Sequence, residues 1–328
     1  MSSLAGKKVL VTGAGGFIGS HLTEKLVTLG AETRAMVHYN ALSGYGWLDS
    51  SSFKNEIQII AGDISDRDSV NEAVKGCDIV FHLAALIAIP YSYQAPYSYV
   101  RTNIEGTLNI LQACRANNVG RVLHTSTSEV YGTARYAPID EKHPLQGQSP
   151  YSATKIGADK LAEAFYLSFE IPVVTVRPFN TFGPRQSARA VIPTIITQCL
   201  NNRVVRLGNL RPTRDLNFVA NTVEGFLMAA SAEGAVGKSI NFGSGREISI
   251  GDLAALIARL IGCDITIKTD EVRLRPENSE VERLIADNSL AETLVGWKPR
   301  VSLEEGLGLT IEWMRQHLEQ YRPGLYVV

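Results

Sequence analysis

KVLVTGAGGFIG, residues 8–19, is the stretch that decides the fold of this chain. A short strand-forming run leads directly into a loop with glycines at positions 13, 16 and 19, and the residues that follow have helical spacing. A tight turn, a close backbone approach to a pyrophosphate and close helix packing each require a residue without Cβ, and a helix N-terminus attracts phosphate charge. The stretch therefore predicts a dinucleotide site, whose candidate residues here are Gly13, Gly16, Phe17, Ile18 and Gly19.

The alternation of strand and helix continues through the first half of the chain. Longer segments such as 20–30 and 100–118 have apolar residues at helical spacing and end in Gly or Asn. They separate β-branched runs at 8–13, 32–38, 56–63, 78–85, 121–127 and 173–178. This pattern is typical of an α/β fold of Rossmann type, a doubly wound parallel sheet with helices on its faces.

The second half is organised differently. Beyond residue 180 the pattern loosens into loops, helices and short strands. We expect residues 1–180 to form an NAD(P)-binding domain and residues 181–328 to form mainly a smaller substrate-binding domain. Because residues 218–245 again read as helix and then strand, the chain is expected to return to the sheet at about 215–245.

Composition narrows the class of protein. A net charge of -1 gives no reason to expect nucleic acid or an anionic membrane as partner. The cysteines have no C-x-x-C spacing, so no metal site or disulfide framework is expected, and they are interpreted as reduced, buried thiols: Cys77, Cys114, Cys199 and Cys263. The first ten residues lack an apolar signal region, and no apolar run reaches the ~18 residues of a membrane span. We expect a cytoplasmic protein.

The position that would select between NAD and NADP carries no acidic residue. An Asp or Glu about 20 residues after the glycine loop would bind the ribose hydroxyl, but residues 37–40 read VHYN. Arg34 or His38 could serve a 2′-phosphate instead, so the choice stays open. Asp63 is placed to touch the adenine, or to cap a turn. Further candidates for the cofactor pocket are Ile64, Leu83, Ala84 and Ala85.

YSATK, residues 151–155, places Tyr151 and Lys155 four positions apart on one face of a helix. A phenol with a pKa near 10 acts as a base near neutrality only if its anion is stabilised by roughly 4 kcal/mol. A nearby ammonium and an oxidised nicotinamide can supply that stabilisation. Tyr151 is therefore predicted to take a hydroxyl proton while hydride leaves for the cofactor.

These residues together resemble the extended short-chain dehydrogenase/reductases that modify nucleotide sugars. The resemblance covers essentially the whole chain and rests on GAGGFIGSHL, FHLAA, NIEGTLNIL, TSTSEVYG, SPYSATK, RPFNTFGPRQ, RDLNFV and SLEEGL. It implies that Thr127 hydrogen-bonds the sugar and that Tyr151 and Lys155 carry the oxidation. It also implies a homodimer in which helices 100–118 and 151–169 pair.

TSTSEVYG, residues 125–132, places Glu129 at a strand end where family members that only epimerise C4 usually have no acid. A dehydratase needs a base there, because a C4 ketone acidifies the C5 proton and hydroxide then leaves from C6. General base catalysis is typically worth 10² to 10⁴ in rate. Many dehydratases of the family carry Asp-Glu where this chain has Ser128-Glu129, so the acid for the leaving hydroxyl stays unassigned.

Two neighbouring activities compete with dehydration. STSEVYG also resembles the UDP-glucuronate decarboxylases, and a 4-epimerase is a further alternative. A dinucleotide-sensing regulator is the non-enzyme alternative, against which the presence of Tyr151 and Lys155 argues. Longer stretches are similar to the GDP-N-acetylglucosamine 4,6-dehydratases of legionaminic acid biosynthesis, namely residues 86–96, 125–155, 177–198 and 274–284.

The resemblance also implies how the nucleotide sugar is held. Arginine grips phosphate oxygens in a bidentate fork, and Arg214 and Arg275 match the positions that bind the diphosphate. In the segment 86–92, Leu86 and Ala88 replace the usual Glu and His and could make room for a 2-acetamido group. Further candidates for substrate binding are Ser92, Asn180 and Arg185.

Overall fold

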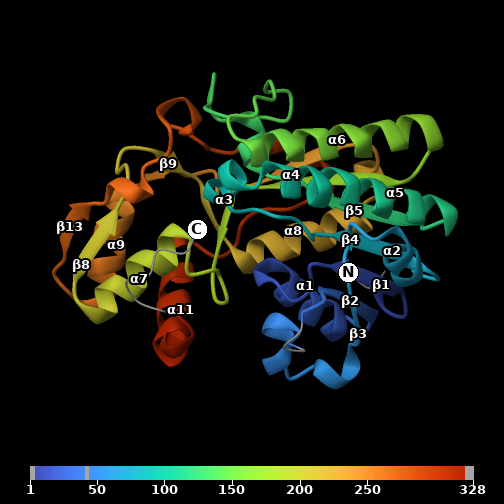
Figure 1. Cartoon of the computed structure of the whole chain (residues 1–328), viewed down its shortest axis with the longest axis horizontal. Helices are drawn as coiled ribbons and strands as arrows, with labels where there is room; N and C mark the ends of the chain where they lie inside the picture. Colours follow the sequence, from blue (N-terminus) through green and yellow to red (C-terminus); the bar gives the residue numbers. More distant parts are fainter. Residues whose placement is uncertain (1–3, 41–43, 322–328) are drawn as a thin grey trace.

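The computed structural model describes residues 4–40 and 44–321, and its centre is a seven-stranded parallel sheet (Figure 1). The strand order is β11-β6-β5-β4-β1-β2-β3. From β1 the chain adds strands toward one edge as far as β3, and from β4 onward it adds them toward the other edge. The expected doubly wound fold is confirmed. The strands are β1 Lys8–Thr12, β2 Glu32–His38, β3 Gln58–Gly62, β4 Ile79–His82, β5 Arg121–Thr125, β6 Val173–Pro178 and β11 Ser239–Phe242.

Helices cover both faces of this sheet. One face packs on α1 (Phe17–Thr28) and α8 (Val219–Ser231), and the other packs on α2 (Arg67–Val74), α5 (Gly106–Ala116) and α6 (Pro150–Phe169). Successive side chains of a strand point to opposite faces, so Val9 and Val11 join the first core while Leu10 joins the second. Because both faces are buried, the strands read as nearly continuous apolar runs.

Two predicted elements have different bounds in the structure. The strand predicted at 121–127 ends at Thr125, because the Thr127 side chain accepts a hydrogen bond from the Glu129 amide and begins a single-turn 3₁₀ helix, η5 (Ser128–Tyr131). Glu129 therefore lies in this turn and not at a strand end. The helix predicted at 100–118 begins as a π-helix, η4 (Val100–Glu105), before α5.

A second group of elements lies to one side of the sheet, at the left of Figure 1. It contains α7 (Val191–Asn201), α9 (Ile250–Ile261), α11 (Leu303–Gln316) and the parallel pair β8 (Val204–Leu207) and β13 (Thr266–Thr269). The other elements are β7 Asn180–Phe182, β9 Thr213–Arg214, β10 Leu216–Phe218, β12 Ile248–Ser249, α3 Ile89–Gln94, α4 Pro96–Tyr99, α10 Ser289–Val295, η2 Gly46–Ser50, η3 Lys54–Glu56, η6 Glu233–Ala235, η7 Glu271–Arg273, η8 Glu277–Ser279 and η9 Leu318–Gln320.

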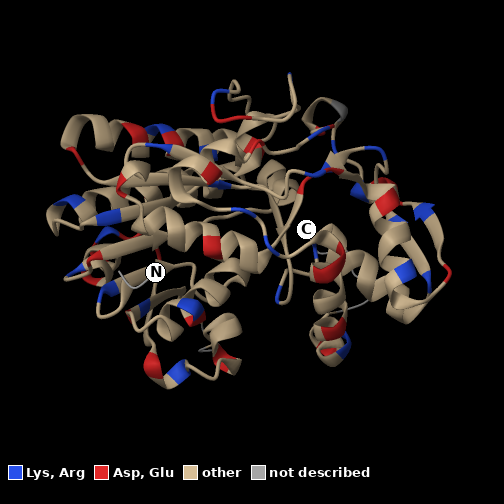
Figure 2. Ribbon diagram, turned by 180° about the vertical axis from the view of Figure 1, so that it is seen from behind, with Lys and Arg blue, Asp and Glu red and all other residues tan. Residues whose placement is uncertain are grey.

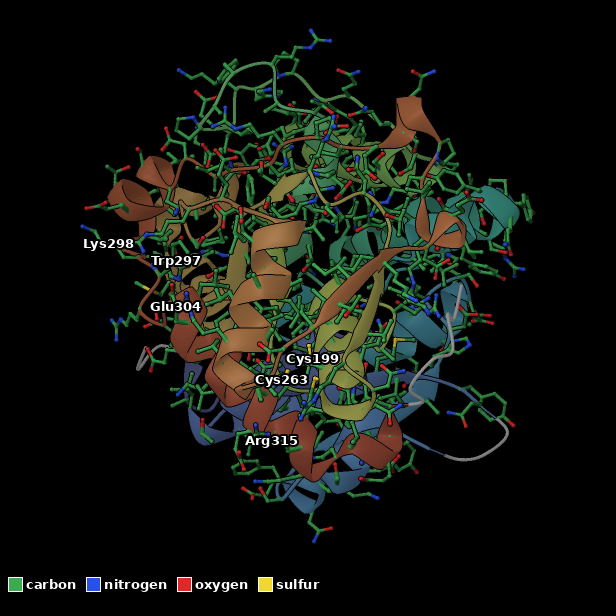
Figure 3. The ribbon with its side chains drawn as sticks, turned by 90° about the vertical axis from the view of Figure 1, so that its left-hand side faces the viewer. Cys199, Cys263, Trp297, Lys298, Glu304 and Arg315 are labelled. Atoms are coloured by element: carbon green, nitrogen blue, oxygen red, sulfur yellow. The ribbon has the colours of Figure 1, made fainter. Side chains whose placement is uncertain are left out.

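The charged residues are spread through the molecule (Figure 2), whereas most of the cysteine thiols are buried. Basic and acidic residues are interspersed along the ribbon, with both kinds in most parts of the molecule (Figure 2). Cys77, Cys114 and Cys199 are buried, whereas Cys263 is only half-buried, contrary to expectation. Cys199 and Cys263 lie side by side in the second group of elements (Figure 3), and burial together with this neighbour raises the pKa of Cys199 to about 12.

Within 4–40 and 44–321, no helix is long and apolar enough to cross a membrane.

Candidate active site

A cleft of about 1280 Å³ opens along the carboxyl ends of the sheet strands. It begins at the glycine loop after β1, passes the ends of β2, β4, β5 and β6, and reaches residues 207–216 and 272–280 of the second half. Ligands of doubly wound sheets bind at this edge, where the strand order reverses. The cleft is therefore the candidate active site.

The glycine loop, which we call the cradle, packs so closely against neighbouring backbone that an added Cβ would collide with it. Gly13 has φ +69, and a Cβ there would lie 2.8 Å from the Ala84 amide nitrogen. A Cβ on Gly19 would lie 2.2 Å from the Gly13 carbonyl oxygen. The backbone of Gly16 caps α1, whose N-terminus faces the cleft, so this end of the cleft fits a dinucleotide. The predicted cofactor residues that line it are Gly13, Gly16, Phe17, Ile18, Gly19, His38, Asp63, Ile64, Leu83, Ala84 and Ala85.

Gly13→Ala tests the cradle, with Gly76→Ala as its matched control. Gly76 has a similar φ of +74, but a Cβ there would meet nothing within 4 Å. Gly76→Ala should lower the free energy of unfolding by about 1–2 kcal/mol through backbone strain alone. Gly13→Ala should lower it further and abolish NAD binding in a calorimetric titration. Wild-type affinity in Gly13→Ala would contradict the cradle.

Two of the predicted cofactor residues, Asp63 and Arg34, lie in different surroundings near the ends of β2 and β3. The Asp63 carboxylate accepts hydrogen bonds from the Ser65 amide and hydroxyl, each at 2.8 Å, and it also lines the cleft. Burial raises the pKa of Asp63, but the Ser65 bonds and the nearby His38 and Arg101 lower it overall. Asp63 is thus a turn cap at the pocket wall. Arg34 is not in that wall, because its guanidinium binds Gln58 and the carbonyl oxygens of residues 73 and 75.

Tyr151 and Lys155 both line the cleft from the first turns of α6. The helix starts there because the Ser149 hydroxyl accepts from the Ser152 amide in a capping box, with a proline at the first helical position. The Lys155 ammonium donates to the Thr125 carbonyl oxygen at 2.7 Å. The side chains of Tyr151 and Thr127 are hydrogen-bonded to each other.

The protein's own groups do not lower the pKa of Tyr151. Burial raises this pKa, the hydrogen bond with Thr127 opposes the rise, and the negative charge of Glu129 adds to it. Burial lowers the pKa of Lys155 and the negative charge of Asp159 opposes this, so that the pKa is about 8. The Lys155 ammonium is held in place by its hydrogen bond to the end of β5.

Glu129 lies on η5 with only 8 % of its surface exposed, and it lines the cleft beside Tyr151. Its negative charge raises the pKa of Tyr151 and opposes the burial that lowers the pKa of Arg214. The carboxylate therefore acts electrostatically on both the Tyr151 phenol and the Arg214 guanidinium. Ser128, the other residue of the predicted pair, is buried and also lines the cleft.

A carboxylate that sequence reasoning missed joins the two predicted phosphate-binding arginines. The Arg214 guanidinium donates to Glu280 at 3.2 Å, and Arg275 forms an ion pair with the same carboxylate at 3.6 Å. All three line the cleft together with Asn180, whose buried Oδ1 has no hydrogen-bond partner among the described residues. Arg275 and Glu280 are five residues apart, a spacing that does not by itself predict an ion pair between them.

Two predicted substrate residues lie outside the lining of the cleft. Arg185 forms a bidentate ion pair with Glu24 of α1, with both distances 3.0 Å, and each side chain is less than a fifth exposed. Its guanidinium is thus engaged with the protein and is not presented to a diphosphate. Ser92 is fully buried and donates to the Ile89 carbonyl oxygen at 2.6 Å. Within 4–40 and 44–321, no cluster of His, Cys, Asp or Glu could hold a metal ion.

Comparison with known sequences places this geometry among enzymes of nucleotide sugars. Residues 10–310 match the protein family described as GDP-mannose 4,6 dehydratase. A dTDP-glucose 4,6-dehydratase from an Actinoplanes strain is 32% identical over 319 residues, covering 94% of this chain and 98% of the relative. The trifunctional enzyme RHM1 of Arabidopsis thaliana, which includes UDP-glucose 4,6-dehydratase activity, is 31% identical over 97% of this chain. The chain spans only 48% of that relative's length.

The solved structures that are similar to this chain are also enzymes of nucleotide sugars. DesIV, a dTDP-glucose 4,6-dehydratase from Streptomyces venezuelae with NAD and TYD bound, has a TM-score of 0.87 and 27% identity, covering 96% of this chain and 99% of that chain. A UDP-glucuronic acid 4-epimerase mutant from Bacillus cereus, with a fluorinated substrate analogue and NAD, has a TM-score of 0.87 and 30% identity, covering 94% and 99%. Dehydratases and epimerases of nucleotide sugars therefore share this fold.

Proposed function

This chain belongs to the GDP-mannose 4,6-dehydratase family, and on that premise we propose that it is a nucleotide-sugar 4,6-dehydratase. The substrate that we propose is an NDP-N-acetylglucosamine, with GDP favoured over UDP. The product is the 4-keto-6-deoxy sugar nucleotide. The observation that carries the proposal is the buried Glu129 carboxylate in the cleft beside Tyr151.

Oxidation at C4 is assigned to Tyr151. NAD, which is bound in the related DesIV structure, supplies when bound a hydride acceptor, a positive charge and the hydride that returns to C6. Tyr151 takes the proton of the C4 hydroxyl, and Thr127, its hydrogen-bond partner, orients the phenol. Lys155 is fixed by the Thr125 carbonyl and contributes the ammonium charge.

Elimination of water is assigned to Glu129. Once C4 is a ketone, the C5 proton is acidic, and a carboxylate in the sugar end of the cleft removes it. The electrons of the C5–H bond form the C5–C6 double bond while the C6 hydroxyl leaves. Protonated Glu129, directly or through a water molecule, returns the proton to that leaving oxygen. C5 of the product then takes a proton from solvent, which balances the proton that Tyr151 took from the C4 hydroxyl and gives up to solvent.

The sugar and the base are proposed from separate features. Leu86 and Ala88 line the cleft, and their small or apolar side chains leave space for a 2-acetamido group. Arg214, Arg275 and Asn180 line the cleft, and we propose that they hold the diphosphate. The preference for guanine, and a role in legionaminic acid biosynthesis, rest on the resemblance of residues 125–155 and 177–198.

A nucleotide-sugar 4-epimerase is the second candidate, because an epimerase has the same fold at 30% identity. A UDP-glucuronate decarboxylase is a third. Epimerisation at C4 needs no base beyond Tyr151, so it leaves Glu129 without a role. A homodimer through α5 and α6 is proposed on the family resemblance; the exposure of Leu167 and Phe169 near the end of α6 is consistent with it.

One experiment separates these activities. The purified protein is incubated separately with GDP-N-acetylglucosamine, UDP-N-acetylglucosamine and UDP-glucuronate, without added cofactor. The masses of the products are then measured by mass spectrometry. Loss of one water from an N-acetylglucosamine nucleotide is the expected result and identifies the base. Loss of carbon dioxide from the glucuronate would instead identify a decarboxylase. An unchanged mass with an altered C4 configuration by NMR would identify an epimerase.

A further inference from the structure

Asp159 is a buried carboxylate that the proposed reaction does not use. It lies on α6 one turn beyond Lys155 and is only 4 % exposed. His124 Nε2 lies 3.0 Å from its Oδ1, and the Ser126 hydroxyl donates to its Oδ2 at 2.8 Å. The Arg177 guanidinium donates to the same Oδ2 at 3.1 Å. Asp159 therefore ties the catalytic helix to both β5 and β6.

The partners of Asp159 and Lys155 alternate along residues 124–126, which are the end of β5 and the residue that follows it. His124 and Ser126 bind Asp159, and the carbonyl oxygen of Thr125, between them, accepts from the Lys155 ammonium. Two successive turns of α6 thus hold the same strand end. That strand end continues directly into residues 127–129, which carry the proposed sugar-binding hydroxyl and the proposed base.

The network reaches that turn a second time through Arg177. Its guanidinium donates to the Tyr131 hydroxyl at 2.9 Å, and this hydroxyl donates to the Asn241 amide oxygen at 2.7 Å. Tyr131 belongs to η5, the same turn as Glu129. A displacement of Asp159 would therefore be transmitted to both ends of residues 126–131.

The charges around the Lys155 ammonium single out Asp159. The negative charge of Asp159, on the same helix, raises the pKa of Lys155, and the Lys155 charge in turn lowers the pKa of His82 of β4 and of His124 of β5. Burial lowers the pKa of both histidines, which keeps them neutral near pH 7. Burial raises the pKa of Asp159, but His124, Arg177 and Lys155 lower it to about 2. Asp159 is thus an anion throughout the physiological range.

We propose that Asp159 is a positioning residue of the oxidation step: it holds the end of β5 against α6 and places its negative charge one helical turn from the Lys155 ammonium. The proposal rests on the proposed roles of Tyr151 and Lys155. Placement errors of 1 Å from residues that do not touch the substrate can lower a rate by about 10²-fold. The hold on the end of β5 and the effect on Lys155 should both be lost when the carboxylate charge is removed.

Asp159→Asn keeps the shape of the side chain and removes its charge. We expect kcat to fall by about 10²-fold, with KM for the nucleotide sugar little changed. Without the anion, Lys155 holds its proton less tightly, so its pKa falls and the alkaline limb of the kcat profile moves to lower pH. Ser126→Ala is the matched control, because it removes one hydrogen bond and leaves the charge. Its alkaline limb should stay in place.

A second readout needs neither substrate nor cofactor. NMR titration of selectively labelled lysine, assigned with Lys155→Met, should show a lower Lys155 pKa in Asp159→Asn than in the wild type. Asp159→Glu, which retains the charge, should keep the wild-type value even if kcat falls. An unchanged Lys155 titration in Asp159→Asn, or an Asp159→Glu value displaced as far, would overturn the proposal. Failure of the proposed reaction alone would leave this titration unaffected.

Discussion

Tyr151→Phe should abolish turnover, with kcat lowered by about 10²- to 10⁴-fold or more. The substitution removes only the phenolic oxygen, which is the group that takes the C4 proton. Because every later step requires the C4 ketone, no water should be released and no proton should exchange at C5. NAD binding should persist, since the glycine cradle is formed by other residues. Mass spectrometry of the nucleotide sugar and a calorimetric NAD titration measure the two effects separately.

Tyr99→Phe is the matched control for this prediction. The Tyr99 ring packs edge-on against Tyr151, with centroids 6.3 Å apart, and its hydroxyl donates to the Ala88 carbonyl oxygen. Losing that hydrogen bond should lower the free energy of unfolding by about 1 kcal/mol and leave turnover of the same order as the wild type. Wild-type turnover in Tyr151→Phe would overturn the assignment of the base for C4.

The sheet could be predicted from the sequence because its signals are local. Each strand is a short apolar run, and the glycine loop sits between the first strand and its helix, where the chain alone determines the geometry. The pairing of Tyr151 with Lys155 is equally local, since a spacing of four fixes one face of a helix. Asp159 continues that spacing by four more residues, so its face, though not its partners, could have been read from the sequence.

Contacts between residues far apart in the sequence could not be predicted. The Arg185 guanidinium, which was predicted to bind substrate, pairs with Glu24, 161 positions away. Arg214 and Glu280, 66 positions apart, could not be paired from any local pattern. The end of β5 was placed two residues too late, because one hydrogen bond to the Thr127 side chain decides whether the backbone stays extended or turns. Such contacts depend on the finished fold.

Glu129→Gln should stop water release while still allowing oxidation at C4. Glutamine has the shape of the carboxylate but cannot accept the C5 proton, so dehydration should slow by about 10²- to 10⁴-fold. A quenched reaction should then contain the 4-keto sugar nucleotide, two hydrogen atoms lighter than the substrate and with its C6 hydroxyl intact. In deuterated water, the wild type should also exchange the C5 hydrogen, and Glu129→Gln should not.

Glu280→Gln distinguishes loss of this base from loss of any carboxylate in the cleft. Glu280 pairs with Arg214 and Arg275, so its substitution should change KM for the nucleotide sugar through those arginines. It should leave exchange at C5 intact, because Glu129 still accepts the proton. If Glu129→Gln released water at the wild-type rate, or if only Glu280→Gln stopped exchange, Glu129 would not be the base. The chemistry that separates a dehydratase from an epimerase would then have to be assigned to another residue of the cleft.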